Sequence, residues 1–248
     1  MNPVQARRIA TYTYITYMLL MTAGMTLTSL VFHDVYPSLT MMKVLLPFEI
    51  AMVLLCGTVM VRYFSPAMIF GPVHKPALGW MAPLYLALVV AWVAIFLALR
   101  EKSVAPDAWS AFMITGIVTL LVGISEELMF RGIILQALLK SGSAQRAVLI
   151  SALAFSSLHA INIIAHHSWL MMAGQLAMTF IFGLFSAAVT IRLRNLLPMI
   201  VFHWLWDFQA FVPTVMPVPP LLYISGTIVL ELVMGIVLWK GLRNYKPA

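Results

Sequence analysis

The stretch Trp80–Leu99, which reads WMAPLYLALVVAWVAIFLAL, decides the fold because it contains 20 consecutive residues without a charge. An α-helix rises about 1.5 Å per residue, so a run of this length crosses the roughly 30 Å hydrocarbon layer of a bilayer. Further apolar runs of similar length lie between turn and charge signals. They are Thr11–Phe32, Met41–Arg62, Trp109–Leu139, Ala147–Ile164, Leu170–Ile191, Leu196–Val212 and Leu221–Trp239. The sequence therefore predicts an all-α, polytopic membrane helical bundle of about eight transmembrane helices, with residues 1–248 forming a single transmembrane domain.

The composition of the chain agrees with this prediction. Hydrophobic residues make up 62% of the 248 residues and charged residues only 9%, whereas a soluble domain carries about 25% charged residues. A soluble protein this apolar would expose large apolar patches. The composition therefore argues against a soluble enzyme. The single cysteine, Cys56, can form no intrachain disulfide and is interpreted as a small buried hydrophobe.

The basic residues follow a pattern that predicts the orientation in the membrane. If the N-terminus is cytoplasmic, 11 of the 15 lysines and arginines fall in cytoplasmic segments. These are Arg7, Arg8, Arg62, Lys75, Lys140, Arg146, Arg192, Arg194, Lys240, Arg243 and Lys246. Basic cytoplasmic loops are typical of membrane proteins, and they explain the formal charge of +7 without a nucleic-acid partner. We therefore expect a multi-pass protein with both termini in the cytoplasm. The compact chain, without extra domains or eukaryotic sorting signals, indicates a prokaryotic plasma membrane.

Ionisable side chains inside the apolar runs are few, and each needs a reason because burying a charge in hydrocarbon is costly. They are Glu49, Glu126, Glu127, Arg131, His159, His203, Asp207 and Glu231. Glu49 and Glu231 stand alone, and we expect them to be helix-packing or lipid-interface residues. The others form three groups, and each group lies on a different predicted helix.

The first group lies in EELMFR, residues 126–131. Glu127 precedes Arg131 by four residues, which is the spacing and order that favour an ion pair on one helix face. Such a pair would hold Glu127 as a fixed charge that supports the site. Glu126 points about 100° away and has no charged residue four positions later. Two adjacent carboxylates in different environments can separate a structural charge from a working acid or base, although both glutamates could also simply hydrogen-bond neighbouring helices.

The second group is His159 in FSSLH, residues 155–159, and the third is His203 with Asp207, four residues apart on one helix face. Alone, His159 could be an interhelical hydrogen-bonding residue. At about 1.5 Å per residue, however, Glu126 and His159 lie about 18–20 Å from the cytoplasmic end of their helices. His203 lies about 10 Å and Asp207 about 16 Å from that end. The four side chains share one slab in the cytoplasmic half to middle of the membrane, a level that would suit substrates arriving from the inner leaflet.

Together the three motifs resemble the signature of the CPBP family, which comprises CAAX prenyl endopeptidases and bacteriocin-processing or abortive-infection proteins. That signature reads EExxxR, then FxxxH, then HxxxN or HxxxD on three membrane helices. Here it corresponds to Glu126-Glu127-xxx-Arg131, Phe155-xxx-His159 and His203-xxx-Asp207. The resemblance covers a motif-bearing catalytic core over residues 109–208. Asp207 stands where many members have asparagine.

The resemblance implies an intramembrane endopeptidase that hydrolyses a peptide bond of a membrane-associated or lipidated peptide. In such an enzyme Glu126 and His159 would activate a water molecule. His203 and Asp207 would stabilise the oxyanion or position the scissile carbonyl. The physical requirements agree, because hydrolysis needs a base and a donor aimed at the developing oxyanion. The expected partners are a peptide or prenylated protein substrate and the membrane lipids.

Metal dependence is a separate question, because members of the family are often labelled metalloproteases. Zinc bound by His159, His203 and Glu126 is a possible cofactor, since two histidines and a carboxylate are common zinc ligands. The helical H-E-x-x-H zinc motif is absent from the sequence, however. We therefore expect a glutamate-dependent mechanism without an obligatory metal.

Two other functions stay open on the same fold. Intramembrane glutamate, histidine and aspartate also form proton relays, so the chain could be a proton-coupled transporter, although it has no internal repeat of the kind many transporters show. It could also be a non-catalytic immunity or scaffold protein, as the family name allows. His166 and His167 fall in an outer loop, where surface histidines are the default.

Overall fold

The computed structural model describes residues 1–100, 102–165, 168–219 and 224–245. Every regular element in these residues is helical and none is a strand, which confirms the all-α prediction. The long helices are α1 (Pro3–Leu30), α2 (Leu39–Tyr63), α4 (Ala82–Leu99), α5 (Pro106–Glu127), α7 (Ala144–Leu158), α8 (Trp169–Leu193), α9 (Leu197–Phe211) and α10 (Ile224–Lys240). The shorter elements are α3 (Ala67–Phe70), η1 (Lys75–Trp80), η2 (Leu128–Ile134), α6 (Leu135–Leu139), η3 (His159–Ala165) and η4 (Val212–Thr214).

Five helical stretches of the described residues are long and apolar enough to cross a membrane. They are Leu39–Tyr63, Ala82–Leu99, Pro106–Leu139, Ala144–Ala165 and Trp169–Leu193, and each coincides with a predicted run. The other three predicted runs correspond to α1, α9 and α10. Threonines and tyrosines interrupt the apolar residues of α1, while α9 has 15 residues and α10 has 17. The chain is thus a helical protein with several membrane-spanning helices, and the number eight stays a prediction. Residues 221–223 of the last run and the loop histidines 166 and 167 lie outside the described residues.

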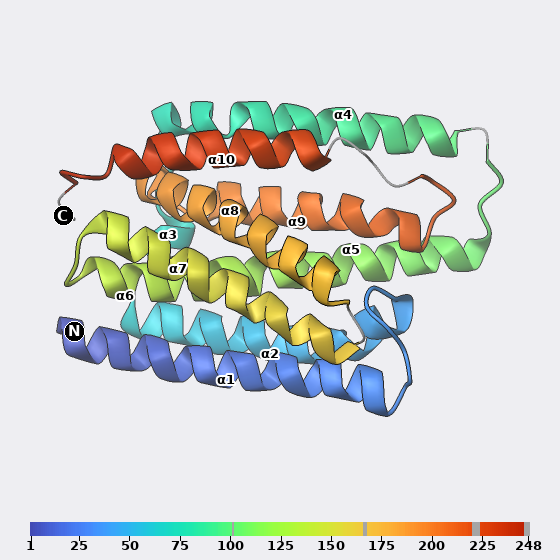
Figure 1. The fold of residues 1–248 in the computed structure, drawn as a ribbon, viewed down its shortest axis with the longest axis horizontal. Helices are drawn as coiled ribbons and strands as arrows, with labels where there is room; N and C mark the ends of the chain where they lie inside the picture. Colours follow the sequence, from blue (N-terminus) through green and yellow to red (C-terminus); the bar gives the residue numbers. More distant parts are fainter. Residues whose placement is uncertain (101, 166–167, 220–223, 246–248) are drawn as a thin grey trace.

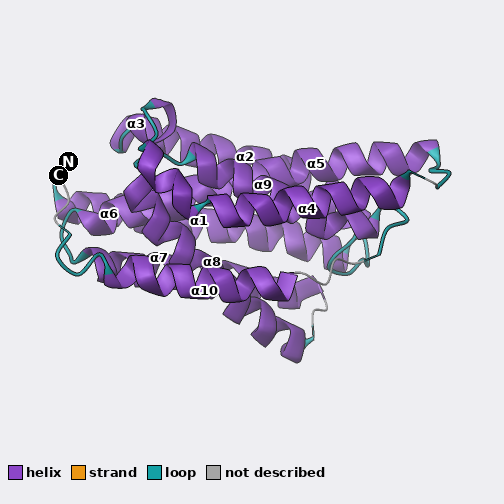
Figure 2. Ribbon diagram, turned by 90° about the horizontal axis from the view of Figure 1, so that it is seen from above, coloured by secondary structure: helices purple, strands orange, loops and turns teal. Residues whose placement is uncertain are grey.

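The long helices run side by side along one axis of the molecule (Figure 1). Helix α1 begins and α10 ends at the same end of the bundle, which we call the near end; the opposite end is the far end. Helix α5 packs against both α2 and α9, so it occupies the interior of the bundle. Helices α7, α8 and α10 pack in sequence along one side, where Figure 2 shows them as a separate layer.

Two glycines let the helices that carry the motifs approach closely. A Cβ on Gly123 of α5 would lie 3.0 Å from the backbone nitrogen of Trp204 in α9. A Cβ on Gly183 of α8 would lie 3.0 Å from the Cα of Ala152 in α7. Small residues at such crossings are typical of membrane helices, because they allow backbone-to-backbone contact. The EExxxR helix and the HxxxD helix are therefore held in direct contact.

The predicted run Trp109–Leu139 is one continuous helical stretch, but its geometry changes in the middle. Residues Leu128–Ile134 form a π-helix between α5 and α6. A π-turn inside an α-helix is rare and often accompanies a functional site. This wide turn begins directly after Glu127 and contains Arg131, and the sequence analysis did not foresee it. Pro198 lies in the first turn of α9, where a proline costs no hydrogen bond.

Candidate active site

Arg131 is a fully buried cation that four side chains surround. Its Nη1 atom lies 3.0 Å from Oε1 of Glu127, which is the ion pair expected from the four-residue spacing. Its Nη2 atom donates a hydrogen bond to Ser186 of α8. The guanidinium also lies 4.3 Å from the ring centre of Phe155 and 5.4 Å from that of Phe182. The carboxylate, the hydroxyl and the two ring faces compensate part of the lost hydration of this charge, whereas Nε and Nη1 have no hydrogen-bond partner among the described residues.

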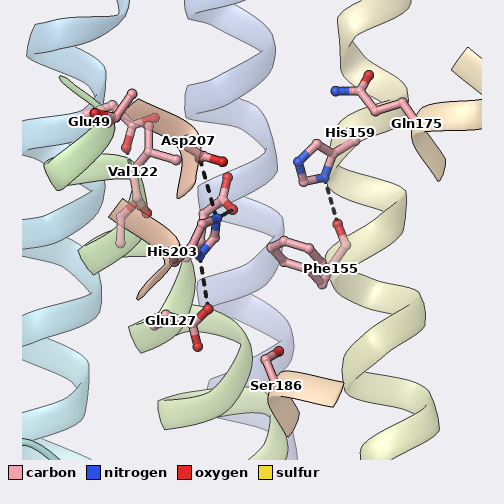
Figure 3. A network of polar contacts seen from close by, with 12 residues as sticks. Glu49, Val122, Glu127, Phe155, His159, Gln175, Ser186, His203 and Asp207 are labelled. Carbon is pink, nitrogen blue, oxygen red and sulfur yellow. Dashed lines mark hydrogen bonds and ion pairs between the residues drawn. The ribbon is translucent and has the colours of Figure 1, made fainter. Parts of the chain in front are cut away.

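His203 lies among three carboxylates. Its Nδ1 atom is 3.0 Å from Oε1 of Glu127. Its Nε2 atom is 3.5 Å from Oε2 of Glu126 and 3.5 Å from Oδ2 of Asp207. Figure 3 shows Asp207, His203 and Glu127 one below another along the bundle. The ionised Glu127 can only accept hydrogen bonds, so Nδ1 donates to it, and a proton on Nε2 would point toward Glu126 and Asp207.

His159 is held in one orientation by the backbone of its own helix. It lies where α7 ends and the tighter 3-10 helix η3 begins. Its Nδ1 atom is 3.1 Å from the carbonyl oxygen of Phe155. Because a carbonyl only accepts, Nδ1 carries the proton and Nε2 of the neutral ring is an acceptor. Phe155 therefore acts twice, since its carbonyl orients His159 (Figure 3) and its ring covers Arg131.

A small cavity of about 80 Å³ joins the predicted site residues. Glu126, His159, Asp207 and Glu49 all line it, and four methionines of α1 and α2 form much of the rest of its wall. In the described part of the chain, no hydrogen bond or ion pair joins Glu126 directly to His159. A water molecule occupies about 30 Å³ in the liquid, so a cavity of this size has room for water between the two side chains.

A second, larger cavity of about 320 Å³ extends from the same place between α8, α9 and α10. Its histidine and carboxylate lining residues are His159, His203, Asp207 and Glu231. Its apolar walls include Phe155, Met178, Phe182, Trp206, Phe211 and Ile228. The two cavities share Tyr36, His159, Asp207 and Phe211. They therefore meet beside His159 and Asp207.

Tyr36 lies at this junction, although it belongs to the segment between α1 and α2 at the far end of the bundle. Its hydroxyl oxygen accepts a hydrogen bond from Nε2 of Gln175 at 3.3 Å. Burial, with a further contribution from the nearby Asp207 carboxylate, raises the pKa of Tyr36 above its ordinary value. The phenol therefore keeps its proton at neutral pH. The sequence analysis missed this residue, because a tyrosine between two helices carries no local signal.

Glu49 and Glu231 also face the cavities, and neither lies at a lipid interface. Glu49 is 0% exposed, lines the small cavity and accepts a hydrogen bond from the hydroxyl of Ser125 at 2.9 Å. Glu231 is 2% exposed and lines the large cavity. Of the two expected roles, the lipid-interface role is therefore wrong for both, whereas the hydrogen bond of Glu49 to Ser125 of α5 agrees with helix packing. The sequence did contain one signal for both residues. An isolated carboxylate in an apolar run is costly to bury, so such a residue usually has a functional role.

The proposed zinc ligands do not have the geometry of a metal site. In the described residues, no three His, Cys, Asp or Glu side chains are grouped so that they could hold a metal ion. His159 lies apart from His203 and Asp207, and its Nδ1 atom faces the carbonyl of Phe155 (Figure 3). Zinc needs its ligand atoms about 2.0–2.2 Å from a common centre. The observed arrangement does not fit it.

The fold and these contacts define a helical membrane protein with a buried cluster of carboxylates and histidines. Residues 107–209 match the family described as type II CAAX prenyl endopeptidase Rce1-like. This segment, which carries all three motifs, is therefore similar to a family of membrane proteases. Among the curated proteins, none is significantly similar to the chain. All the motif residues lie within the matched segment, whereas Tyr36, Glu49 and Glu231 lie outside it.

Proposed function

We propose that the chain is an intramembrane endopeptidase that hydrolyses a peptide bond in a membrane-associated or lipidated peptide. The observation that carries the proposal is that Glu126, His159 and Asp207 line one small cavity beside His203. The similarity of residues 107–209 to a protease family supports it. The chain would act in a plasma membrane, with α1, α9 and α10 crossing as well and both termini in the cytoplasm.

Glu126 and His159 activate the attacking water in this proposal. Both residues line the small cavity. Oε2 of Glu126 accepts no hydrogen bond from the described residues, although Nε2 of His203 lies 3.5 Å away, and Nε2 of His159 is the unprotonated ring nitrogen. Glu126 takes the proton of the water as the oxygen attacks the scissile carbonyl, and later returns it to the leaving amine. Glu127 is unsuited to this role, since Arg131 and His203 already hold its Oε1.

His203 is the donor for the developing oxyanion, and Asp207 keeps it oriented. The Nδ1 atom of His203 is anchored on Glu127, so Nε2 stays directed toward Glu126 and Asp207. A preorganised donor in a site without bulk water stabilises the transition state strongly. Asp207 is 25% exposed and borders both cavities, so a carbonyl bound at their junction would lie beside this pair.

The test is hydrolysis of a membrane-embedded peptide by the purified protein. The Glu126→Gln variant keeps the shape of the side chain but cannot accept the proton, so kcat should fall by about 10²–10⁴-fold. His159→Ala should be similarly damaging, and the double variant should be barely worse, because the two residues act on one water. Asp207→Asn should be milder, since an amide preserves a hydrogen bond to His203.

The matched control is Asp107→Asn, another acid-to-amide change on α5 at an exposed position in its first turn. It should retain the wild-type rate. If Glu126→Gln also hydrolyses the peptide at the wild-type rate, the catalytic proposal is wrong. The same buried groups would then serve proton transfer or a scaffold role.

A further inference from the structure

Glu231 is a buried carboxylate that the proposed mechanism does not use. It lies on α10, outside the segment that matches the protease family, and is 2% exposed. Its Oε1 atom has no hydrogen-bond partner in the part of the chain that the structure describes. A buried carboxylate oxygen without a hydrogen bond is costly unless a ligand or a proton compensates it.

The surroundings of Glu231 are a cavity, not a packed helix interface. Glu231 lines the large cavity of about 320 Å³ together with His159, His203 and Asp207. Ligand-binding cavities typically begin near 300 Å³, so the space suits a substrate side chain and its neighbours. Met178, which is 41% exposed, and the exposed Ala210 also line this cavity, so it reaches the side of the bundle.

The charges around the cavity are unbalanced. Its lining residues include no lysine and no arginine. Arg131 is not a lining residue of this cavity, and it forms an ion pair with Glu127. Any proton that His203 carries is already shared among Glu126, Glu127 and Asp207. Among the described cavity-lining residues, His203 is the cation that acts on Glu231 at a distance, and its ring nitrogens already face three other carboxylates.

We infer that Glu231 is a specificity-determining residue that binds a basic side chain of the peptide substrate in the large cavity. The inference rests on the proposed endopeptidase function. A substrate held with its scissile carbonyl at the junction of the cavities would place a neighbouring lysine or arginine beside Glu231. The apolar walls of the cavity would pack against the methylene groups of that side chain, because lysine and arginine commonly bury these groups against apolar surface.

Binding and cleavage of paired peptides test this inference. One set of N-acetylated, membrane-embedded peptides carries a single lysine that is moved through successive positions on both sides of the central bond. A second set carries neutral norleucine at the same positions. Binding is measured with the Glu126→Gln variant of the full chain, so that the peptides stay intact, and cleavage is measured with the wild-type chain.

At one position, the lysine peptide should bind at least about tenfold more tightly than its norleucine analogue, because it neutralises a desolvated carboxylate. Adding Glu231→Gln should remove that preference and leave norleucine binding within about twofold. Glu231→Asp, which keeps the charge, should retain part of the preference. The matched control is Glu49→Gln, which removes the buried carboxylate of the small cavity and should leave the lysine preference intact.

Equal binding of the lysine and norleucine peptides at every position would overturn the inference. A lysine preference that survives Glu231→Gln in folded protein would also overturn it. A further control uses norleucine peptides whose N-terminus is free, because a terminal amine could bind Glu231 in place of a lysine side chain. If only the free amine strengthens binding, the inference is wrong. If the wild-type chain cleaves no peptide, the endopeptidase proposal fails, while the binding preference still decides the role of Glu231.

Discussion

At the scale of single residues, Arg131 holds the site together. It joins α8, through Ser186, to the Glu127 carboxylate that anchors His203. The ring of Phe155 on α7 covers the same guanidinium. Lysine could not replace it, because only the planar guanidinium can contact a carboxylate, a hydroxyl and two ring faces together.

Replacing Arg131 with alanine should therefore destabilise the protein by roughly 3–5 kcal/mol, since Glu127 loses its partner in a buried ion pair. The loss would appear as a lower thermal transition and less folded protein in detergent. Arg62→Ala serves as the control, because Arg62 is exposed in the last turn of α2. A stable and fully active Arg131→Ala protein would show that the ion pair is dispensable.

The arrangement of His159, His203 and Glu126 also predicts the response to chelators. Water activation by Glu126 and His159 requires no metal, so activity should persist after exhaustive chelation. The measurement is peptide hydrolysis before and after removal of divalent ions. Complete loss of activity that zinc alone restores would instead mean that these side chains rearrange to bind the metal.

At the scale of helices, the contact between α5 and α9 aligns the glutamates with His203. Gly123 lies one turn before Glu127, and its Cα faces the backbone of Ile200 and Trp204. The indole nitrogen of Trp204 donates to the carbonyl of Gly116 at 2.9 Å, which fixes the register of the two helices. The π-turn that begins after Glu127 then places Arg131 for its contacts with α8.

A larger side chain at Gly123 should separate these helices and move His203 away from the glutamates. Gly123→Val is expected to reduce kcat/KM by about 10²-fold, the cost of misplacing catalytic groups by roughly 1 Å. Gly57→Val is the matched control, because no atom lies within 4 Å of a Cβ at Gly57. Equal activity of the two variants would show that close α5–α9 contact is not required.

At the scale of the whole molecule, both cavities extend toward the far end of the bundle. The small cavity is lined by Tyr36, which precedes α2, and by Met41 and Met42 in the first turn of that helix. This differs from the expected approach from the inner leaflet. If the termini are cytoplasmic, the cavities reach from the middle of the membrane toward its outer side.

Reporter fusions test the orientation directly. Fusions at Ala248 should be cytoplasmic, and fusions at Ser103, between α4 and α5, should be external, because the near end of the bundle carries most of the basic residues. The start of α1 and the end of α10 at one end agree with an even number of crossings. An external reporter at Ala248 would reverse the orientation and make the far end cytoplasmic.

The sequence by itself determined the helical character, the ion pair and the candidate motif residues. Trp80–Leu99 is apolar throughout, and the four-residue spacing of Glu127 and Arg131 acts within one helix. Such features are local, so they follow from helix periodicity and from the cost of burying charge. The motifs also indicated the family that matches residues 107–209.

Only the tertiary structure decided which groups His203 contacts, because Glu126 and Glu127 reach it from another helix. It also brought Tyr36, Glu49 and Glu231 to the cavities, although they are far apart in the sequence. A single carboxylate or tyrosine has no periodic pattern that predicts its neighbours. Its environment depends on how helices pack, and glycines such as Gly123 and the π-turn after Glu127 set that packing.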